Sequence, residues 1–435
     1  MRLRVAAALA ACALLLGCGE REVILPGERL PVSAEGGLAP SVPQGARPIA
    51  LAPPQAVAAW THTNGTPEHR VVHPALGPVA GLAWAAEIGV GDTRRHRITA
   101  TPVVAGGRVF TLDALAGVAA HDLAGRPLWF SNLTPPADRP TDASGGGLAY
   151  EGGTLYVTTA FGQLAALDAG TGNVRWVQRL GAAATGTPTV RDGLVYAVSR
   201  DGTGWALDAR TGRVAWQLAG LPDAAGFVGP ASPGVSDTLA VFPFSSGEIL
   251  AVFREGGAEA WRASVRGSRV GRALAAFDDI TGDPVFADGR LYVGNATGRT
   301  VALDPRTGER IWTAGEGAMS PVWPAGDSVF LVSDAAELVR LDAGTGATVW
   351  RAPLPGFVPT RRPGRRRDVV AHHGPVLAGG RLWVASSDGA LRGFSPVTGA
   401  LVRAVPLPGG AASAPVVAGG TLYVVTGEGR LLAYR

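Results

Sequence analysis

The stretch VALDPRTGERIW, residues 301–312, decides how this chain folds, because close copies of it recur along the sequence. Each copy has an apolar run that ends at Asp, a turn that contains Gly, and a second apolar run that ends in Trp. The copies are AALDAGTGNVRW (165–176), WALDARTGRVAW (205–216), VRLDAGTGATVW (339–350) and the diverged VAAHDLAGRPLW (118–129). An Asp that binds its own backbone amides, followed by Gly, is typical of a tight turn between antiparallel strands. The repetition indicates a repeated supersecondary unit.

A second phrase precedes these copies and predicts another pair of strands. It consists of two apolar runs separated by Gly-Gly or Asp-Gly, as in PVVAGGRVF (102–110), PTVRDGLVYAV (188–198) and PVFADGRLYVG (284–294). These dipeptides suit a type I′ turn, which needs positive φ at both central residues. Each unit is therefore expected to be a four-stranded antiparallel meander.

Eight such units start along the chain, so the fold is predicted to be all-β, an eight-bladed β-propeller. The starts lie near residues 101, 147, 187, 231, 283, 320, 374 and 414. A Trp marks the fourth strand of the first six units, and Arg403 takes that place in the seventh: Trp129, Trp176, Trp216, Trp261, Trp312 and Trp350. We expect these side chains to fill the wedge between neighbouring sheets.

The eighth unit ends one strand short, at LLAYR (431–435), and the missing strand is expected from the other end of the chain. LAWAAEI (82–88) carries Trp84 in the same context but has no unit of its own before it. Pairing of this N-terminal strand with the last unit would close the ring and remove the exposed sheet edges.

The N-terminus, MRLRVAAALAACALLLGCGE (1–20), resembles a lipoprotein signal peptide. Residues 1–17 are predicted to be removed, and Cys18 to carry the lipid; the alternative is an ordinary signal peptide that contains a cysteine. Residues 18–58, rich in Pro, Gly and Ala, are expected to form a tether, and residues 59–435 the propeller. Within the tether, VILPGERLPV (23–32) is either a docking peptide or plain linker.

Composition excludes several classes of function. The other cysteine, Cys12, lies in the signal peptide, so the exported body has no disulfide, thiolate metal site or Cys nucleophile. The net charge is +4, and the charged residues are scattered along the chain and form no basic patch in the sequence. This distribution gives no support to nucleic-acid binding. His372 and His373 are adjacent in a predicted strand and so point to opposite faces, which disfavours a shared metal. No metal or cofactor is expected.

The phrase A-x-D-x-x-T-G-x-x-x-W resembles the tryptophan-docking repeat of the pyrroloquinoline-quinone (PQQ) propeller superfamily, over residues 82–435. One class in that superfamily is the PQQ- and Ca²⁺-dependent quinoprotein dehydrogenases. Membership of that class implies a pair of adjacent cysteines against the cofactor and a Glu/Asn/Asp set around Ca²⁺. The cysteine-free body disfavours this alternative, and we do not expect an enzyme.

The other class is the BamB family of outer-membrane assembly factors. Three segments resemble it: GGGLAYEGGTLYVTTAFG (145–162), ASPGVSDTLAVFPFSSGEILA (231–251) and DITGDPVFADGRLYV (279–293). The resemblance implies a non-catalytic lipoprotein scaffold at the periplasmic face of the outer membrane. Its implied partner is the barrel-inserting subunit of the β-barrel assembly machinery, through that subunit's soluble domains. Binding of unfolded outer-membrane protein precursors is kept as a subsidiary role.

One face of the propeller is expected to carry the contacts, because every link from a fourth strand to the next first strand lies on it. The longest of these links are 217–231, 262–283 and 351–374. The resemblance places partner contacts at Phe227 and Val228, and at Asp279 with Asp278 beside it; Val228 stands where the family has Arg. For the two aspartates a solvated turn is the alternative.

The third long link contains an arginine-rich loop, 361–367. It is interpreted as a solvated loop, with contact to anionic lipid or an acidic partner as the alternative.

Overall fold

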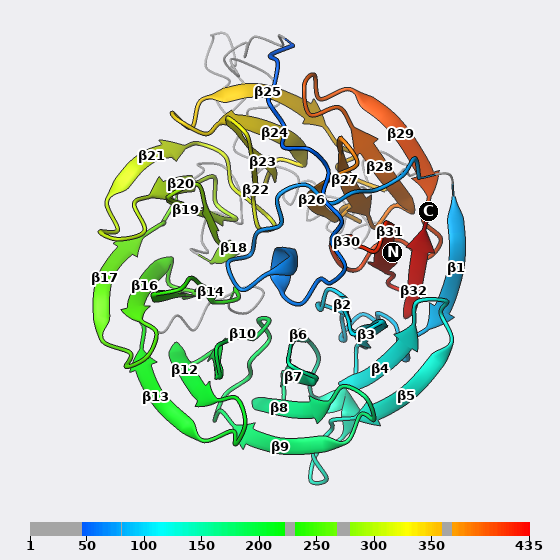
Figure 1. Ribbon diagram of the computed structural model, residues 1–435, viewed down its shortest axis with the longest axis vertical. Helices are drawn as coiled ribbons and strands as arrows, with labels where there is room; N and C mark the ends of the chain where they lie inside the picture. The colour runs from blue at the N-terminus through cyan, green and yellow to red at the C-terminus, as the bar shows by residue number, and fades with distance from the viewer. Residues whose placement is uncertain (1–45, 80, 222–230, 268–278, 359–367) are drawn as a thin grey trace, which may run out of the picture. The chain divides into compact units, whose positions relative to one another are not determined.

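Eight four-stranded antiparallel sheets stand around a common axis in the computed structural model, which describes residues 46–79, 81–221, 231–267, 279–358 and 368–435 (Figure 1). Within these residues the only helices are two short 3₁₀ turns, η1 (Thr63–Gly65) and η2 (Pro140–Asp142). The predicted all-β, eight-bladed propeller is confirmed.

Each blade is one sheet whose strands follow one another from the axis to the rim. The first four blades are β2 (Val103–Ala105), β3 (Arg108–Leu112), β4 (Gly117–Asp122), β5 (Pro127–Asn132); β6 (Gly146–Glu151), β7 (Thr154–Thr159), β8 (Gln163–Asp168), β9 (Val174–Arg179); β10 (Thr189–Arg191), β11 (Leu194–Val198), β12 (Thr203–Asp208), β13 (Val214–Ala219); and β14 (Gly234–Val235), β15 (Leu239–Pro243), β16 (Glu248–Phe253), β17 (Glu259–Ser264).

The last four blades have the same order. They are β18 (Ile280–Ala287), β19 (Arg290–Asn295), β20 (Thr300–Leu303), β21 (Arg310–Ala314); β22 (Trp323–Ala325), β23 (Ser328–Val332), β24 (Glu337–Asp342), β25 (Thr348–Pro353); β26 (His372–Ala378), β27 (Arg381–Ser386), β28 (Ala390–Phe394), β29 (Leu401–Pro406); and β30 (Val416–Ala418), β31 (Thr421–Val425), β32 (Arg430–Tyr434) with β1 (Leu82–Glu87).

The N-terminal strand closes the ring, as the sequence predicts. Strand β1 pairs antiparallel with β32, in a register that places Glu87 opposite Arg430. Gly81 and Arg435 exchange backbone hydrogen bonds of 3.3 Å at the end of this pair. Both ends of the propeller chain therefore share one sheet, and the eighth blade has the same four strands as the others.

The turns have the conformations that their sequences require. In the hairpin between β18 and β19, Asp288 and Gly289 have φ of 49° and 73°, as a type I′ turn demands. In the Asp-x-x-Thr-Gly turn between β8 and β9, the Oδ1 atom of Asp168 accepts hydrogen bonds of 2.9 Å from the amides of Gly170 and Thr171.

Seven tryptophans lock neighbouring blades together. Each indole Nε1 donates a hydrogen bond of 2.8–3.3 Å to a backbone carbonyl in the outer turn of the next blade. A glycine of that turn lies against the same indole, as Gly308 lies against Trp261. The donors are Trp84, Trp129, Trp176, Trp216, Trp261, Trp312 and Trp350.

The eighth interface has no such pair. Arg403 occupies the register position of the tryptophans in β29, opposite Gly393. The next blade has no outer turn there, because its third and fourth strands, β32 and β1, come from the two ends of the propeller chain. The fourth strand of the seventh blade therefore has Arg403 in place of tryptophan, at the interface where the acceptor turn is missing.

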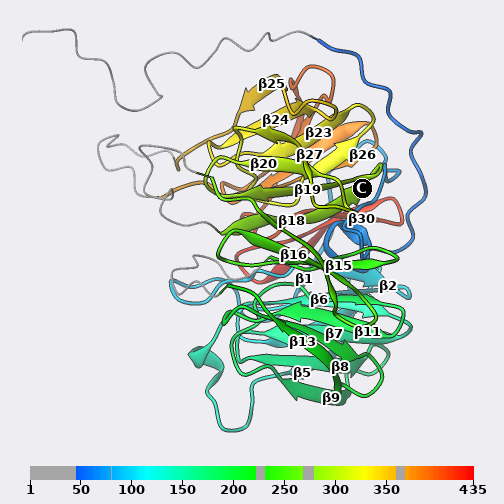
Figure 2. The ribbon, with the colours of Figure 1, turned by 90° about the vertical axis from the view of Figure 1, so that its left-hand side faces the viewer.

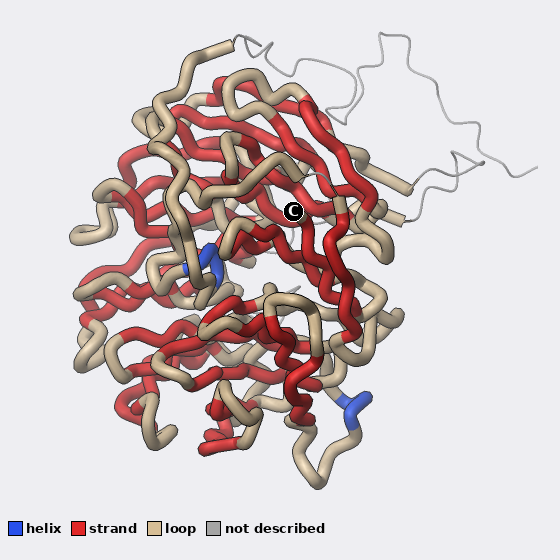
Figure 3. Tube along the Cα trace, turned by 45° about the vertical axis from the view of Figure 1, so that its right-hand side comes forward, coloured by secondary structure: helices blue, strands red, loops and turns tan. Residues whose placement is uncertain are grey.

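Residues 46–79, which we call the plug segment, cross one end of the propeller axis and place η1 over it (Figures 1 and 3). In Figure 2 this segment, in blue, runs along a single face of the disc. It is the face of the hairpin turns, since Val57 O accepts from Gly419 N at 2.8 Å and Pro74 O from Gly379 N at 3.0 Å.

The plug segment forms hydrogen bonds with the blades along its whole length. Its partners by backbone or side-chain hydrogen bonds include Val104, Tyr150, Val190, Val235, Phe286, Val322, Arg340, Gly379 and Gly419, spread over all eight blades. Residues 46–58, assigned to the tether in the sequence analysis, belong to this segment. The fully buried Arg340 donates to Arg47 O at 2.7 Å, and Arg47 forms ion pairs with Asp327 and Asp342.

Candidate functional site: an axial cavity

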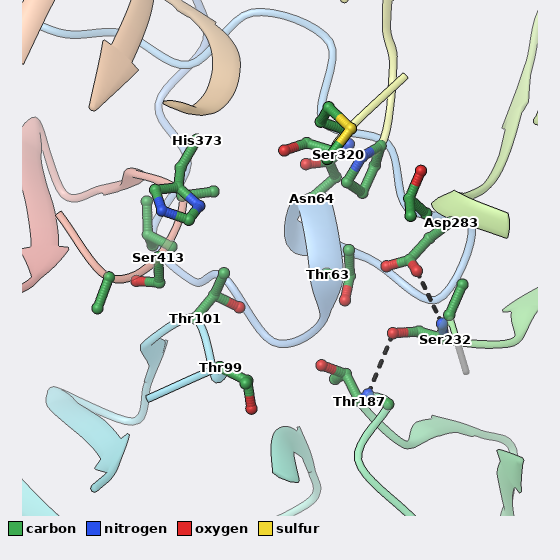
Figure 4. Close-up of a pocket in the computed structure, with 18 of the residues that line it drawn as sticks. Thr63, Asn64, Thr99, Thr101, Thr187, Ser232, Asp283, Ser320, His373 and Ser413 are labelled. Atoms are coloured by element: carbon green, nitrogen blue, oxygen red, sulfur yellow. Dashed lines mark hydrogen bonds between the residues drawn. The ribbon is translucent and has the colours of Figure 1, made fainter. Parts of the chain in front are cut away.

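A cavity of about 320 Å³ lies on the propeller axis, where the inner strands begin (Figure 4). Its floor consists of Trp60, Thr63 and Asn64 of the plug segment. Its wall is made by the residues just before or at the start of the inner strands, from blades one and three to eight. The plug segment therefore makes the axial channel a blind pocket.

The wall is rich in hydroxyl groups because the inner strands begin with a short recurring phrase. A polar residue precedes Pro in Thr101-Pro102, Thr187-Pro188, Ser232-Pro233, Asp283-Pro284 and Ser320-Pro321. All five polar residues line the cavity. Proline restricts the residue before it to extended conformations, which aligns these side chains in the same way in each blade.

Hydrogen bonds link some of these residues from one blade to the next. The amide of Thr187 donates to Ser232 Oγ at 3.1 Å, and the amide of Ser232 donates to Asp283 Oδ1 at 2.7 Å (Figure 4). Each side chain thus accepts from the backbone of the preceding blade, and Asp283 is the acidic member of the series.

Asp283 is a buried carboxyl group, with 9% of its surface exposed. Burial raises its pKa from 3.8 to about 6, although hydrogen bonds from Ser232 and Thr63 oppose the shift. A carboxylate in this position loses hydration and has only neutral donors around it, so its charged form is poorly stabilised.

Histidines lie beneath the cavity and in its wall. His62 and His69 of the plug segment are buried, and burial lowers their pKa to about 3 and about 4. His373 lines the cavity, and burial followed by the neighbouring His372 lowers its pKa to about 4. All three rings are neutral at pH 7. His372 instead hydrogen-bonds Ser386 and Pro355 O, at 2.7 and 2.9 Å.

The described residues that line the cavity lack the side chains of a metal or quinone site. These residues include no group of three or more His, Cys, Asp or Glu side chains that could hold a metal ion. The described lining contains a single carboxylate, Asp283, and no Arg. A Ca²⁺-bound quinone with several carboxylates does not fit this set of side chains.

The structure locates only part of the partner-binding residues expected from the sequence. Asp279 lies directly before β18 with 2% of its surface exposed, so its side chain is inside the protein. Phe227, Val228, Asp278, Cys18 and the segments 23–32 and 361–367 lie outside the described residues. Their roles stay predictions.

Sequence reasoning missed Asp283, and a signal for it was available. The dipeptide Asp283-Pro284 stands where four other blades have Thr-Pro or Ser-Pro. Alignment of the blades on that proline would have shown one acidic residue in a ring of hydroxyls.

Comparison with known proteins decides the family. A family model described as "Outer membrane protein assembly factor BamB" matches residues 114–352 and 341–435, most of the propeller. The chain belongs to the BamB family. BamB of Yersinia pestis is 26% identical over 315 residues, covering 71% of this chain and 76% of that protein. BamB of Escherichia coli K12 is 28% identical over 325 residues, covering 74% and 79%.

Solved structures share the fold. The crystal structure of BamB from Moraxella catarrhalis has a TM-score of 0.66 at 20% identity, covering 80% of this chain and 99% of that one. The quinohemoprotein alcohol dehydrogenase of Comamonas testosteroni has a TM-score of 0.65 at 16% identity, covering 86% and 80%. At these identities the likeness shows a common propeller architecture and not a common activity.

In the part of the chain that the structure describes, no helix has the length and hydrophobicity needed to cross a membrane.

Proposed function

We propose that this chain is a non-catalytic scaffold of the outer-membrane β-barrel assembly machinery. It is held at the periplasmic face of the outer membrane by acyl chains on Cys18, and it docks on the soluble domains of the barrel-inserting subunit. In this role it assists the folding and insertion of outer-membrane proteins, with direct binding of their unfolded precursors as a subsidiary role.

Family membership carries this proposal. The match covers residues 114–435, and the similar proteins from Yersinia pestis and Escherichia coli are named as outer-membrane protein assembly factors. The alternative of a PQQ- and Ca²⁺-dependent dehydrogenase has support from the fold alone. The single carboxylate of the described cavity lining argues against it.

The docking face is proposed to be the one opposite the plug segment. The hairpin face is covered by residues 46–79, whereas the long links 217–231, 262–283 and 351–374 connect outer strands to the next inner strands on the other face. Loops of this kind carry binding sites more often than the strands that hold them.

Affinity capture of the full chain from detergent-extracted outer membranes tests the proposal. We expect a large barrel protein with soluble repeats to be recovered with it. Phe227→Ala or Asp278→Arg should lower that recovery several-fold, since both changes fall in the proposed docking loops. Asp279→Arg is a poor probe, because it would replace a buried acidic side chain by a longer one of opposite charge and destabilise the fold.

Arg306→Glu is the matched control. Its side chain is 85% exposed in the outer turn between β20 and β21, on the hairpin face, so recovery should not change. Capture of a propeller without a partner would contradict the scaffold role. The mass of the purified protein reports separately whether the mature chain begins at an acylated Cys18.

A further inference from the structure

The axial cavity holds a buried carboxyl group, that of Asp283, which no side chain of the described residues neutralises. Asp283 forms no ion pair with a described residue, and the influences on its pKa are burial and hydrogen bonds from the neutral groups of Ser232 and Thr63. Buried carboxylates are normally paired with a cation, because an unpaired charge loses its hydration without compensation. The described lining includes neither Arg nor Lys.

Two further polar side chains of the lining, Ser413 and His373, can accept hydrogen bonds and have no partner among the described residues. Ser413 Oγ is buried without a hydrogen-bond partner in the described structure, and Ser413 is 3% exposed. The side chain of His373 also forms no hydrogen bond with the described residues, and its ring points into the cavity in Figure 4. A neutral imidazole and a hydroxyl each offer a lone pair.

The cavity has room for more than an ion. Its volume of about 320 Å³ exceeds that of a single bound water or a simple cation. Part of the wall is apolar, formed by Ile98, Ile280 and Met319. A ligand with a donor-rich charged end and a short alkyl chain matches both kinds of surface.

We infer that the axial cavity binds a primary ammonium group on an alkyl chain, paired with Asp283 and hydrogen-bonded by the surrounding hydroxyls. The group is carried by a free small amine or by a lysine side chain that a partner inserts along the axis. Anionic ligands are disfavoured because the site contributes a negative charge and no positive one. The small-amine source does not depend on the proposed scaffold role; the lysine source rests on it.

Binding should weaken in acid, because Asp283 becomes protonated. Its pKa of about 6 places this change between pH 7 and pH 5. The titratable groups around it are His62 and His69 beneath the floor and His373 in the wall, whose pKa values of about 3, 4 and 4 keep them neutral over that range. The loss should approach tenfold in affinity at pH 5, before any shift that the amine itself causes.

Isothermal titration calorimetry of the full chain in detergent tests the inference, with n-pentylamine and the amide of N-acetyl-lysine as probes. The neutral isostere pentan-1-ol and the tetramethylammonium ion, which cannot donate a hydrogen bond, are the matched control ligands. We expect saturable 1:1 binding of at least one primary amine and at least tenfold weaker binding of both controls. Binding of the lysine amide identifies a side chain as a suitable source; binding of pentylamine alone points to a free amine.

Asp283→Asn keeps the acceptor for the amide of Ser232 and removes the charge, so it should weaken amine binding at least tenfold. Asp138→Asn, at an exposed position in the loop between β5 and β6, is the control and should bind as the unaltered chain does. Titration of the unaltered chain alone can overturn the inference. It would do so if pentylamine and pentan-1-ol bound equally, or if no amine bound at millimolar concentration. Partner capture is measured separately, so a failed titration leaves the scaffold proposal untouched.

Discussion

The interface between blades is specified by single residues, a tryptophan and the glycine that it meets. Gly308 has φ of 73°, and a Cβ atom there would lie 2.6 Å from the indole of Trp261. Gly289 has the same φ, but its Cβ would meet nothing within 4 Å. Gly289 is therefore required only for its left-handed backbone conformation, whereas Gly308 is also required because a larger residue would clash with the indole.

We predict that Gly308→Ala lowers the free energy of unfolding more than Gly289→Ala does. Both changes incur about 1–2 kcal/mol of backbone strain, and only the first also displaces the indole, at a further cost of about 1–3 kcal/mol. Chemical denaturation of the two variants measures the difference. Equal losses would show that the indole moves aside without cost.

Among the elements, the plug segment depends most on tertiary contacts, because it has almost no regular structure of its own. It holds its place through hydrogen bonds to the blades and through buried side chains. His69 donates a hydrogen bond from Nδ1–H to Pro284 O, 2.9 Å away, because a carbonyl oxygen can only accept. His69 and His62 are both buried, so the stability of the plug segment against the blades depends on pH.

We predict that the protein loses stability as the pH falls from 7 to 5. The pKa values of His62 and His69 are lowered from 6.5 to about 3 and about 4, so the unfolded chain takes up protons that the folded chain does not. Each histidine contributes stability that is present above pH 6.5 and is lost as the pH falls, about 2 kcal/mol by pH 5. Asp283, with its pKa raised to about 6, has the opposite sign and returns about 1 kcal/mol over the same range.

His69→Gln should flatten this pH dependence by about 2 kcal/mol, since it removes one of the buried rings that take up a proton only on unfolding. The unaltered chain is the reference for this slope. Thermal unfolding at pH 7, 6 and 5 provides the comparison. An unchanged slope in His69→Gln would contradict the assignment of a neutral buried ring.

At the scale of the whole molecule, stability depends on closing the ring. Strand β1 completes the eighth sheet, and Trp84 at its centre docks on Leu123 O of the first blade, at 3.2 Å. Without β1, strand β32 would present an unpaired edge and the last Trp dock would be lost.

Two truncations are predicted to differ sharply. A chain of residues 81–435 lacks the plug segment but keeps β1, and it should unfold cooperatively at a lower temperature than the full chain. A chain of residues 89–435 also lacks β1, and it should aggregate or unfold without cooperativity. Scanning calorimetry and light scattering distinguish the two. Equal behaviour of both chains would mean that ring closure adds nothing beyond the plug segment.

The fold could be predicted from the sequence because its determinants are local and repeated. Turn residues such as Asp288 and Gly289 act through their own backbone conformation, so a dipeptide is enough to indicate the hairpin. The Trp phrase recurs at the blade spacing, which indicates both the number of blades and the missing strand that β1 supplies.

The candidate site could not be predicted in the same way, because it exists only where distant segments meet. Asp279 reads as a turn residue in the sequence, and only the packing of the inner strands shows that it is buried. Asp283 and Ser413 belong to different blades and Thr63 to the plug segment, of which residues 46–58 were interpreted as tether. The sequence by itself determined the blades and their closure, through local turn chemistry and periodicity. The tertiary structure alone decided the blind cavity and its unpaired charge, because burial and electrostatic environment arise only from contacts between parts of the chain that are far apart.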